Sequence, residues 1–336
     1  MTLCFAASLL GACSNLEADA PVADGERAPT LKAEAITMAD GTDLALTRYD
    51  PAGKPKAVIL ALHGYADYAR NYALAAPVWA ARGFVVIAVD QRGFGRNDSA
   101  GEWAGGNQMV DDLAQMIVAV SDAFPDLPLH LVGASMGAAV ITGVMGSDGY
   151  DEAKARVTSV ALAAPATRGW RVLPFYFRAT LSSVRRIAPD WSFSGDMVEI
   201  VTTDNIEWLG VLASDPYMLR EGAVRSLYGM AWLMDGAIER AKGLDVPAFV
   251  AYGGKDEVIM PDGLACYMAR APEGVRYRFY PDGYHLILRD KGRAPVIEDI
   301  AAFFENPEAI APLTGAPQGL PEPAGHCTTS GQQDRG

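Results

Sequence analysis

Positive charge is scarce in this sequence. The 336 residues include 28 Lys and Arg against 41 Asp and Glu, which gives a formal net charge of −13. Nucleic acids are bound through Lys and Arg contacts to phosphates, so a nucleic acid is not expected as a partner. Electrostatic docking onto an anionic lipid surface is disfavoured for the same reason. Half of the residues are apolar, which is enough to bury a sizeable core.

Cysteine and histidine are also rare, with four of each. The cysteines are Cys4, Cys13, Cys266 and Cys327, and no pair has the C-x-x-C spacing of a zinc or redox site. A Cys266–Cys327 disulfide is conceivable in an oxidising compartment, but nothing in the sequence supports it. H-E-x-x-H, P-loop and strand-associated G-x-G-x-x-G motifs are missing. We therefore predict no metal and no cofactor.

Long apolar runs are missing too, and no segment approaches the roughly 20 apolar residues of a membrane span. The first ten residues form a short apolar run, followed by Leu10-Gly-Ala-Cys13 and a polar stretch to Pro29. This pattern resembles the lipobox of bacterial lipoproteins, in which the cysteine is lipidated. It predicts a lipid anchor on Cys13, a location in the bacterial cell envelope and contact with a membrane. The alternative is an apolar terminus on a cytoplasmic protein.

Short apolar runs alternate along the chain with segments of helical periodicity. Strands are expected at 44–49, 57–62, 84–89, 129–132, 157–163, 248–252 and 276–280. Helices are expected at 71–81, 109–123, from 138 onward, and at 296–304. This alternation predicts an α/β fold, with a mostly parallel central sheet flanked by helices.

The alternation stops once, where no β-rich run occurs but four of the six tryptophans do: Trp170, Trp191, Trp208 and Trp232. We interpret this segment as a mainly helical cap inserted between two core strands. The expected division is a signal and linker at 1–29, core at 30–166, cap at 167–242, core at 243–306 and a disordered tail at 307–336. The tail is predicted from its Pro, Gly and Gln content.

Gly133-Ala-Ser135-Met-Gly137 matches G-x-S-x-G, the nucleophile elbow. Glycines flank the serine because the strand-to-helix turn leaves no room for a Cβ. An apolar strand precedes the motif and a helix-forming segment follows it, as the elbow requires. Ser135 is therefore the candidate nucleophile.

A serine hydroxyl needs a base, and only four histidines are available. His130 lies inside a buried strand and is expected to be a core residue, and His326 lies in the tail. His63 follows a strand where an oxyanion loop belongs. His285 follows the last strand and precedes the closing helix, which makes it the candidate base.

The acid is expected between these two in chain order. Asp256 follows the strand at 248–252 and is preferred over its rivals, Glu257 and Asp282. Asp282 is close to the histidine in sequence and suits a turn role. The oxyanion needs donors as well, and the backbone N–H groups of Met136 and Tyr65 stand at the appropriate places.

Taken together, these residues resemble the monoacylglycerol lipase and lysophospholipase group of α/β hydrolases, which also includes serine aminopeptidases. The resemblance spans about 30–306 and is carried by His63-Gly-Tyr-Ala-Asp-Tyr-Ala-Arg-Asn-Tyr72, Asp90-Gln-Arg-Gly-Phe-Gly95, Gly133-Ala-Ser-Met-Gly137, Ser214-Asp-Pro216 with Arg225, Gly253-Gly-Lys-Asp256 and Gly283-Tyr-His285. It implies an α/β-hydrolase fold, a Ser135–His285–Asp256 triad, and Tyr65 and Met136 as oxyanion donors. Asp67-Tyr68 replaces the usual Glu-His and Asn97 the frequent Ser, which affects the substrate more than the chemistry.

The sequence thus predicts a serine hydrolase that cleaves esters of single-chain lipids, a monoacylglycerol or a lysophospholipid. A general short-chain carboxylesterase and a serine aminopeptidase are the alternatives. An aminopeptidase requires a carboxylate near the pocket, for which the cap offers Asp196, Glu199, Asp204, Glu207 and Asp215. A remote alternative is a non-catalytic, tethered binding protein that kept the fold.

Overall fold

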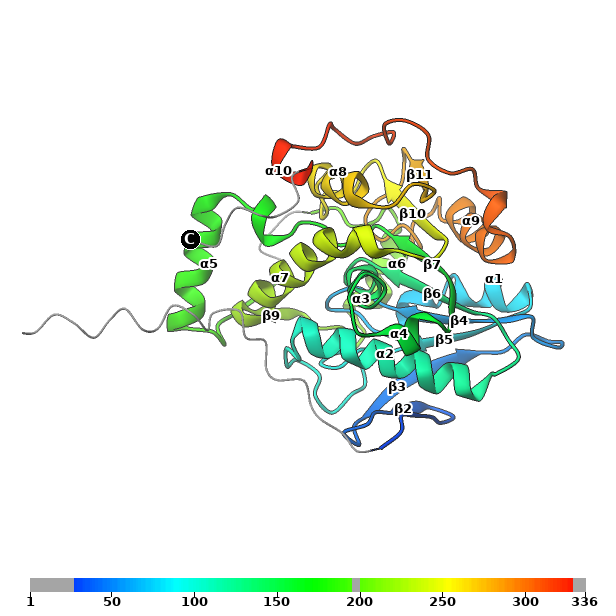
Figure 1. Cartoon of the computed structure of the whole chain (residues 1–336). Helices are drawn as coiled ribbons and strands as arrows, with labels where there is room; N and C mark the ends of the chain where they lie inside the picture. The colour runs from blue at the N-terminus through cyan, green and yellow to red at the C-terminus, as the bar shows by residue number, and fades with distance from the viewer. Residues whose placement is uncertain (1–26, 195–199, 329–336) are drawn as a thin grey trace, which may run out of the picture.

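The structure is a computed structural model that describes residues 27–194 and 200–328, so Cys13 lies outside the described residues. Its centre is a nine-stranded sheet in the order β1-β2-β3-β5-β4-β6-β7-β10-β11 (Figure 1). The strands are β1 (Thr30–Leu31), β2 (Ala35–Thr37), β3 (Asp43–Tyr49), β4 (Ala57–Leu62), β5 (Phe84–Val89), β6 (Leu129–Ala134), β7 (Val157–Ala163), β10 (Ala248–Gly253) and β11 (Arg276–Tyr280).

The six strands from β5 to β11 pair in parallel, while β1, β2 and β3 form an antiparallel edge that joins β5. The predicted mostly parallel sheet is therefore confirmed. All seven strands expected from the sequence are present, each within two residues of its expected bounds. The two additional strands, β1 and β2, have only two and three residues, which is too short for a periodic pattern to reveal.

Helices cover both faces of the sheet, as expected from strands that are apolar throughout. Successive residues of β4 divide between two cores: Val58, Leu60 and Leu62 pack on one face, and Ile59 packs on the other. The helices and 3₁₀ turns of the core that flank the sheet are η1 (Ala69–Tyr72), α1 (Ala76–Ala81), α2 (Gly106–Ala123), α3 (Met136–Met145), α4 (Asp151–Lys154), α8 (Pro261–Arg270) and α9 (Ala294–Glu305).

The inserted segment is mainly helical but contains a small ribbon that the sequence did not predict. It comprises η2 (Trp170–Val172), α5 (Phe175–Ile187), α6 (Ile206–Ala213), α7 (Val224–Arg240) and η4 (Ala241–Gly243), together with β8 (Ser192–Ser194) and β9 (Glu221–Ala223). The two three-residue strands pair antiparallel. Residues 195–220 separate them in the chain, so the pairing has no local sequence signal.

Helix α7 lies between the cap and the core. Its residues Met230, Leu233 and Ile238 belong to the same buried cluster as the sheet, and it crosses the molecule beside α3 (Figure 1). Helix α5 lies further out, and only Leu181 of its residues is buried. Among the described residues, no helix combines the length and the apolar character needed to cross a bilayer.

The segment that follows α9 differs from the disordered tail that its composition predicts. Residues 307–328 run across one side of the molecule from α9 to α8 (Figure 1), through η5 (Pro307–Ala309) to α10 (Gly325–Thr328). Pro312 bridges to Arg276 of β11. Cys327 forms a disulfide with Cys266 of α8, with 4.9 Å between the Cα atoms. These contacts order a segment that has little periodicity of its own.

His130 of β6 is a core residue, as expected. Its Nδ1 lies 2.8 Å from the Ser159 hydroxyl, and its ring stacks on Phe304 with 4.7 Å between the ring centroids. Burial disfavours the charged imidazolium and lowers the pKa of His130 from its ordinary 6.5 to about 4.

This burial predicts a pH-dependent stability. Between pH 6.5 and 4 the unfolded chain binds a proton at His130 that the folded chain does not, so the free energy of unfolding falls as the pH falls through that window. The difference corresponds to roughly 3 kcal/mol. Urea denaturation at several pH values on the wild type and His130→Gln measures it. We expect the variant to have the smaller slope, and equal slopes would contradict the assignment.

Candidate active site

The three residues of the predicted triad follow three strands of the parallel sheet. Ser135 follows β6, Asp256 lies in the loop after β10, and His285 lies in the loop after β11. These strands lie close together in the order β6-β7-β10-β11. Since the carboxyl ends of parallel strands meet at one edge, the topology brings together residues up to 150 positions apart in the chain.

The three side chains form a continuous hydrogen-bonded chain. Nε2 of His285 lies 3.0 Å from Oγ of Ser135, and Nδ1 of His285 lies 2.9 Å from Oδ2 of Asp256. The carboxylate accepts a hydrogen bond from Nδ1–H, which leaves Nε2 free to accept the proton of the serine hydroxyl. Asp256 and His285 are each only 8% exposed, so their pairing is little screened by water. The sequence-predicted trio is thus brought together with the order and geometry of a catalytic triad.

The turn that presents Ser135 is strained and tightly packed. Ser135 has φ of 51° and ψ of −112°, in the left-handed region that L residues rarely adopt. A Cβ on Gly133 would lie 2.5 Å from the backbone N of Ala138, and one on Gly137 would overlap the carbonyl oxygen of Leu62. The two glycines therefore let α3 begin directly against β4 and β6, which pushes the serine out of the sheet edge.

Two backbone N–H groups near the serine are candidates for binding an oxyanion. Met136 is the first residue of α3, and Tyr65 lies in the loop after β4, beside Gly64. A Cβ on Gly64 would lie 3.2 Å from the Ser135 Cβ, so this loop touches the nucleophile turn. Within the described residues, no hydrogen bond uses the N–H of Tyr65 or of Met136. Both are the donors that the sequence predicts for an oxyanion.

The acid is distinguished from its rivals by its contacts. The second oxygen of Asp256 accepts hydrogen bonds from the backbone N–H groups of Val258 and Ile259, both at 2.9 Å, which orients the carboxylate. Glu257 instead accepts the backbone N–H of Val201 at 2.9 Å. The Asp282 side chain is 93% exposed and pairs with Lys255. Only Asp256 reaches the histidine.

His63 has a structural place beside the site. It is fully buried, its Nε2 accepts the backbone N–H of Gln91 at 2.9 Å, and its Nδ1 lies 2.7 Å from the carbonyl of Gly64. Burial lowers the pKa of His63 below its ordinary value, which keeps the ring neutral. The ring thereby holds the Tyr65 loop in position and takes no part in the hydrogen-bonded chain of the triad.

The cap contacts both catalytic loops through its backbone. The N–H of Leu219 donates to the carbonyl of Ala66 at 3.0 Å, and the N–H of Leu286 donates to the carbonyl of Thr202 at 2.8 Å. The hydroxyl of Thr203 also donates to Asp290 at 2.6 Å, just beyond the histidine. The sequence analysis missed these positioning contacts, because they join segments with no shared local pattern.

The carboxylates that an aminopeptidase needs are largely engaged elsewhere. Asp215 is 3% exposed and accepts hydrogen bonds from the Tyr68 hydroxyl at 2.7 Å and from Arg70 at 2.5 Å. Asp204 accepts the backbone N–H of Lys291 at 2.8 Å. Glu207 is exposed on α6. Asp196 and Glu199 lie outside the described residues.

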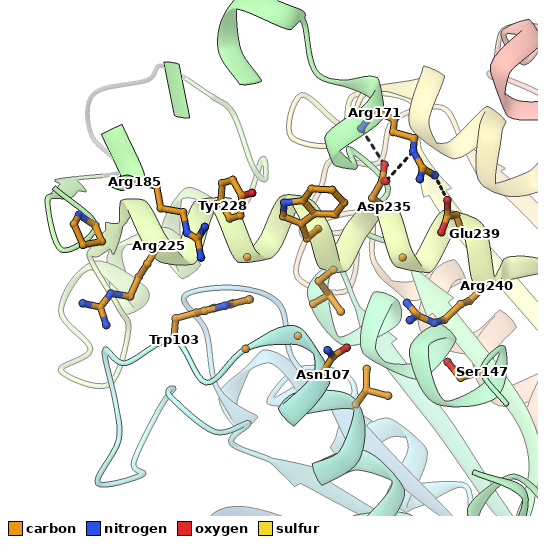
Figure 2. Close-up of a pocket in the computed structure, with 18 of the residues that line it drawn as sticks. Trp103, Asn107, Ser147, Arg171, Arg185, Arg225, Tyr228, Asp235, Glu239 and Arg240 are labelled. Atoms are coloured by element: carbon orange, nitrogen blue, oxygen red, sulfur yellow. Dashed lines mark hydrogen bonds and ion pairs between the residues drawn. The ribbon is translucent and has the colours of Figure 1, made fainter. Parts of the chain in front are cut away.

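A cavity of about 750 Å³ lies along α7 (Figure 2), and none of the three triad residues lines it. Trp103, Tyr228 and Trp232 line it, but so do several arginines, and Ser135 does not. This cavity is therefore separate from the candidate active site. Trp170 and Trp232 stack with 5.5 Å between centroids and Tyr228 packs against both, so these rings form the cap's own core.

Comparison with known proteins agrees with this geometry. A family model described as serine aminopeptidase, S33, matches residues 53–292. The monoacylglycerol lipase of Mycolicibacterium smegmatis is 26% identical over 269 residues, which cover 78% of this chain and 93% of that protein. The monoglyceride lipase of Mus musculus is 24% identical over 280 residues, which cover 82% and 90%.

Solved structures show the same fold. A soluble variant of the monoglyceride lipase of Saccharomyces cerevisiae, in complex with a substrate analogue, has a TM-score of 0.67 at 17% identity and covers 86% of this chain and 98% of that one. A carboxyl esterase of Bacillus coagulans has a TM-score of 0.67 at 21% identity and covers 81% and 96%. Because the family match extends over most of the chain, from before β4 to beyond His285, this protein belongs to the serine aminopeptidase S33 family of α/β hydrolases.

Proposed function

We propose that this protein is a serine hydrolase that cleaves carboxylic esters of single-chain lipids through an acyl-enzyme on Ser135. The observation that carries the proposal is the chain of hydrogen bonds from Ser135 through His285 to Asp256. A non-catalytic binding protein has no need of all three groups in this geometry, together with two unused backbone donors beside the serine.

The geometry supports acyl transfer in two steps. His285 Nε2 takes the proton from Ser135 as the serine oxygen bonds to the ester carbonyl carbon, and the N–H groups of Tyr65 and Met136 hold the resulting oxyanion. His285 then gives that proton to the leaving alcohol as the ester C–O bond breaks. A water molecule, activated by the same imidazole, releases the carboxylic acid and restores the serine. Asp256 remains ionised throughout and stabilises the imidazolium.

Ester substrates are favoured over aminoacyl amides by the carboxylates around the site. An aminopeptidase needs a negative group to hold the substrate ammonium, and such a group must not already be neutralised. Asp215, the one buried carboxylate among the described candidates, is already neutralised by Arg70. Serine aminopeptidase activity is therefore the second candidate, carried by the name of the family, and short-chain carboxylesterase activity is the third.

Lipid substrates are supported by the relatives and by the surface of the cap. The curated relatives include monoacylglycerol and monoglyceride lipases and a Bacillus subtilis phospholipase. On α5, Phe175 and Tyr176 are 77% and 72% exposed, and Phe177 is also exposed. Three consecutive exposed aromatic residues suit contact with the apolar surface of a lipid aggregate. We propose a monoacylglycerol or lysophospholipid as the substrate.

We also propose that Cys13 is lipid-modified and tethers the enzyme to a membrane of the bacterial cell envelope. The support comes from Leu10-Gly-Ala-Cys13 and from the polar stretch that links it to the described part of the chain at Arg27. A tether would hold the catalytic edge near its lipid substrates without a membrane-spanning helix. A cytoplasmic enzyme without an anchor is the alternative.

Replacing the nucleophile should abolish turnover without unfolding the protein. We expect Ser135→Ala to lower kcat for a butanoyl ester by about three powers of ten or more, because only the oxyanion donors and substrate binding remain. A fluorophosphonate probe should label the wild type but not the variant. Ser183→Ala, which changes an exposed serine on α5, is the matched control. Retention of more than about a tenth of kcat would overturn the assignment.

Acyl-chain length should control the specificity. Each methylene buried on binding contributes about 0.8 kcal/mol, so lengthening a monoester from four to eight carbons should raise kcat/KM by up to roughly two powers of ten. The measurement compares butanoyl, octanoyl and longer monoesters with an aminoacyl-naphthylamide. Preference for the short ester would support the carboxylesterase, and faster amide cleavage would support the aminopeptidase.

The anchor can be tested at the mature N-terminus. Mass spectrometry of protein made from its natural start codon in its native host should find a lipid-modified Cys13 as the first residue. An unmodified Cys13 still preceded by Ala12 would refute the anchor and leave the cytoplasmic alternative.

A further inference from the structure

The cavity beside α7 has no part in the proposed hydrolysis. It is bounded by α7, by the start of α2 with the loop before it, and by the end of α5 (Figure 2). None of Ser135, Asp256 and His285 lines it. Its volume of about 750 Å³ lies within the range of small-molecule binding sites, which are usually concave and pre-formed.

Positive charge is concentrated around this cavity, although the whole chain carries −13. Two carboxylates and five arginines line it, the arginines being Arg171, Arg185, Arg186, Arg225 and Arg240. Arg171 pairs with Asp235 and Glu239, and Arg225 pairs with Asp190. Once these pairs are formed, the lining keeps an excess of positive charge.

Three of the arginines carry that excess. In the part of the chain that the structure describes, no carboxylate lies within ion-pair distance of Arg185, Arg186 or Arg240. The Arg185 guanidinium lies over the ring of Tyr228, with 4.2 Å from its central carbon to the ring centroid. In Figure 2 its end points toward Trp103, while Arg240 reaches in from the opposite end of the cavity, toward Asn107.

Two tryptophans, Trp103 and Trp232, line the cavity beside the arginines. Their indole N–H groups are buried away from it and find no acceptor among the described residues. The two side chains therefore offer apolar ring surface, and not hydrogen-bond donors, to a ligand.

Helix α7 keeps room for the Trp103 ring and the Arg240 guanidinium with two glycines, Gly229 and Gly236. A Cβ on Gly229 would overlap the indole nitrogen of Trp103, and a Cβ on Gly236 would overlap a terminal nitrogen of Arg240. Glycine within a helix lowers its stability relative to alanine. The two glycines lie two turns apart on the cavity face, and the close approach of a side chain at each position explains them.

The start of α2 adds further positive potential. This helix of 18 residues begins at the cavity, where Gly105, Gly106 and Asn107 form part of the lining. Its first turn has no acidic residue, and its N-cap glycine offers no side-chain hydrogen bond. The positive end of the helix dipole therefore points at the same space as the arginines.

We propose that this cavity binds the phosphate monoester group of an organic molecule. A phosphate monoester carries about −1.5 to −2 charges at pH 7 and three acceptor oxygens, which match guanidinium groups that have no carboxylate partner. Arginine forks bind phosphate in a bidentate manner. The cavity is larger than a phosphate group, so the organic part of the ligand lies against Trp103, Trp232 and Leu233. A fatty-acid carboxylate carries only one negative charge and a monoacylglycerol carries none, so both match the positive lining less well than a phosphate monoester does.

Isothermal titration calorimetry on Ser135→Ala tests binding without turnover. The probes are inorganic phosphate, glycerol 3-phosphate, 1-dodecanoylglycerol 3-phosphate and, as the uncharged reference, glycerol, because a monoacylglycerol would bind at the triad as a substrate. We expect at least one organic phosphate monoester to bind tighter than the uncharged reference by about tenfold or more, as for hydrogen bonds between charged groups. Similar affinity for both organic phosphates would identify a water-soluble ligand, and tighter binding of the acylated one would identify a lipid.

Variants locate the site. At least one of Arg185→Gln and Arg240→Gln, each added to Ser135→Ala, should weaken binding about tenfold or more, and the one that does so shows at which end of the cavity the phosphate binds. Arg220→Gln removes the same charge from an exposed position of the cap outside the cavity and should change the Kd less than about twofold. In the otherwise wild-type enzyme, all three substitutions should leave butanoyl ester hydrolysis unchanged, which shows that the fold survives.

Three results would overturn the proposal. They are no binding of any phosphate probe, equal affinity for the uncharged reference, and binding that neither cavity variant weakens. None of them bears on the hydrolase, because the titrations use a variant that lacks the nucleophile and the cavity does not include the triad.

Discussion

The close packing of α3 against β4 and β6 is the constraint on which the active site depends. Gly133 and Gly137 have no room for a side chain, because the helix starts directly against the strands. This approach holds Ser135 at a positive φ, a conformation that costs on the order of 1–3 kcal/mol and persists only where the surroundings over-determine it. Hydrogen bonds from the Ser135 N–H to the Ala163 carbonyl, and to the Ser135 carbonyl from Ala138 and Ala166, provide that support. The strained turn exposes the hydroxyl and leaves the N–H at the start of α3 unused.

The remaining groups reach the serine through sheet order and through the cap. Strands β10 and β11 carry Asp256 and His285 to the same edge, and the cap then contacts the loops on both sides of the nucleophile. One backbone hydrogen bond joins Leu219 to the oxyanion loop at Ala66, and another joins Thr202 to the histidine loop at Leu286. A movement of the cap is therefore mechanically linked to the position of the donor and of the base. The geometry of the site thus depends on the cap as well as on the sheet.

The distribution of charge separates two kinds of chemistry in one molecule. A net charge of −13 is a statement about the whole surface, and it disfavours partners that need a broad basic face. Around the cavity beside α7 the sign is reversed, because Arg185, Arg186 and Arg240 have no carboxylate partners among the described residues. A local site can thus bind an anion that the average charge would repel. The catalytic edge instead uses neutral backbone donors, which suit a charge that develops only during the reaction.

The sequence by itself determined the features that are encoded locally. Apolar runs of a few residues predict the seven long strands, and two glycines mark the elbow around Ser135. The order of the chain then identifies the loops with Asp256 and His285. The structure decided what depends on segments that meet from far apart in the chain. It distinguished Asp256 from Glu257, ordered residues 307–328 beside α8, paired β8 with β9, and gathered arginines from α5 and α7 at one cavity. No local pattern predicts these contacts. Each depends on which surfaces are still exposed or unpaired once the sheet has formed.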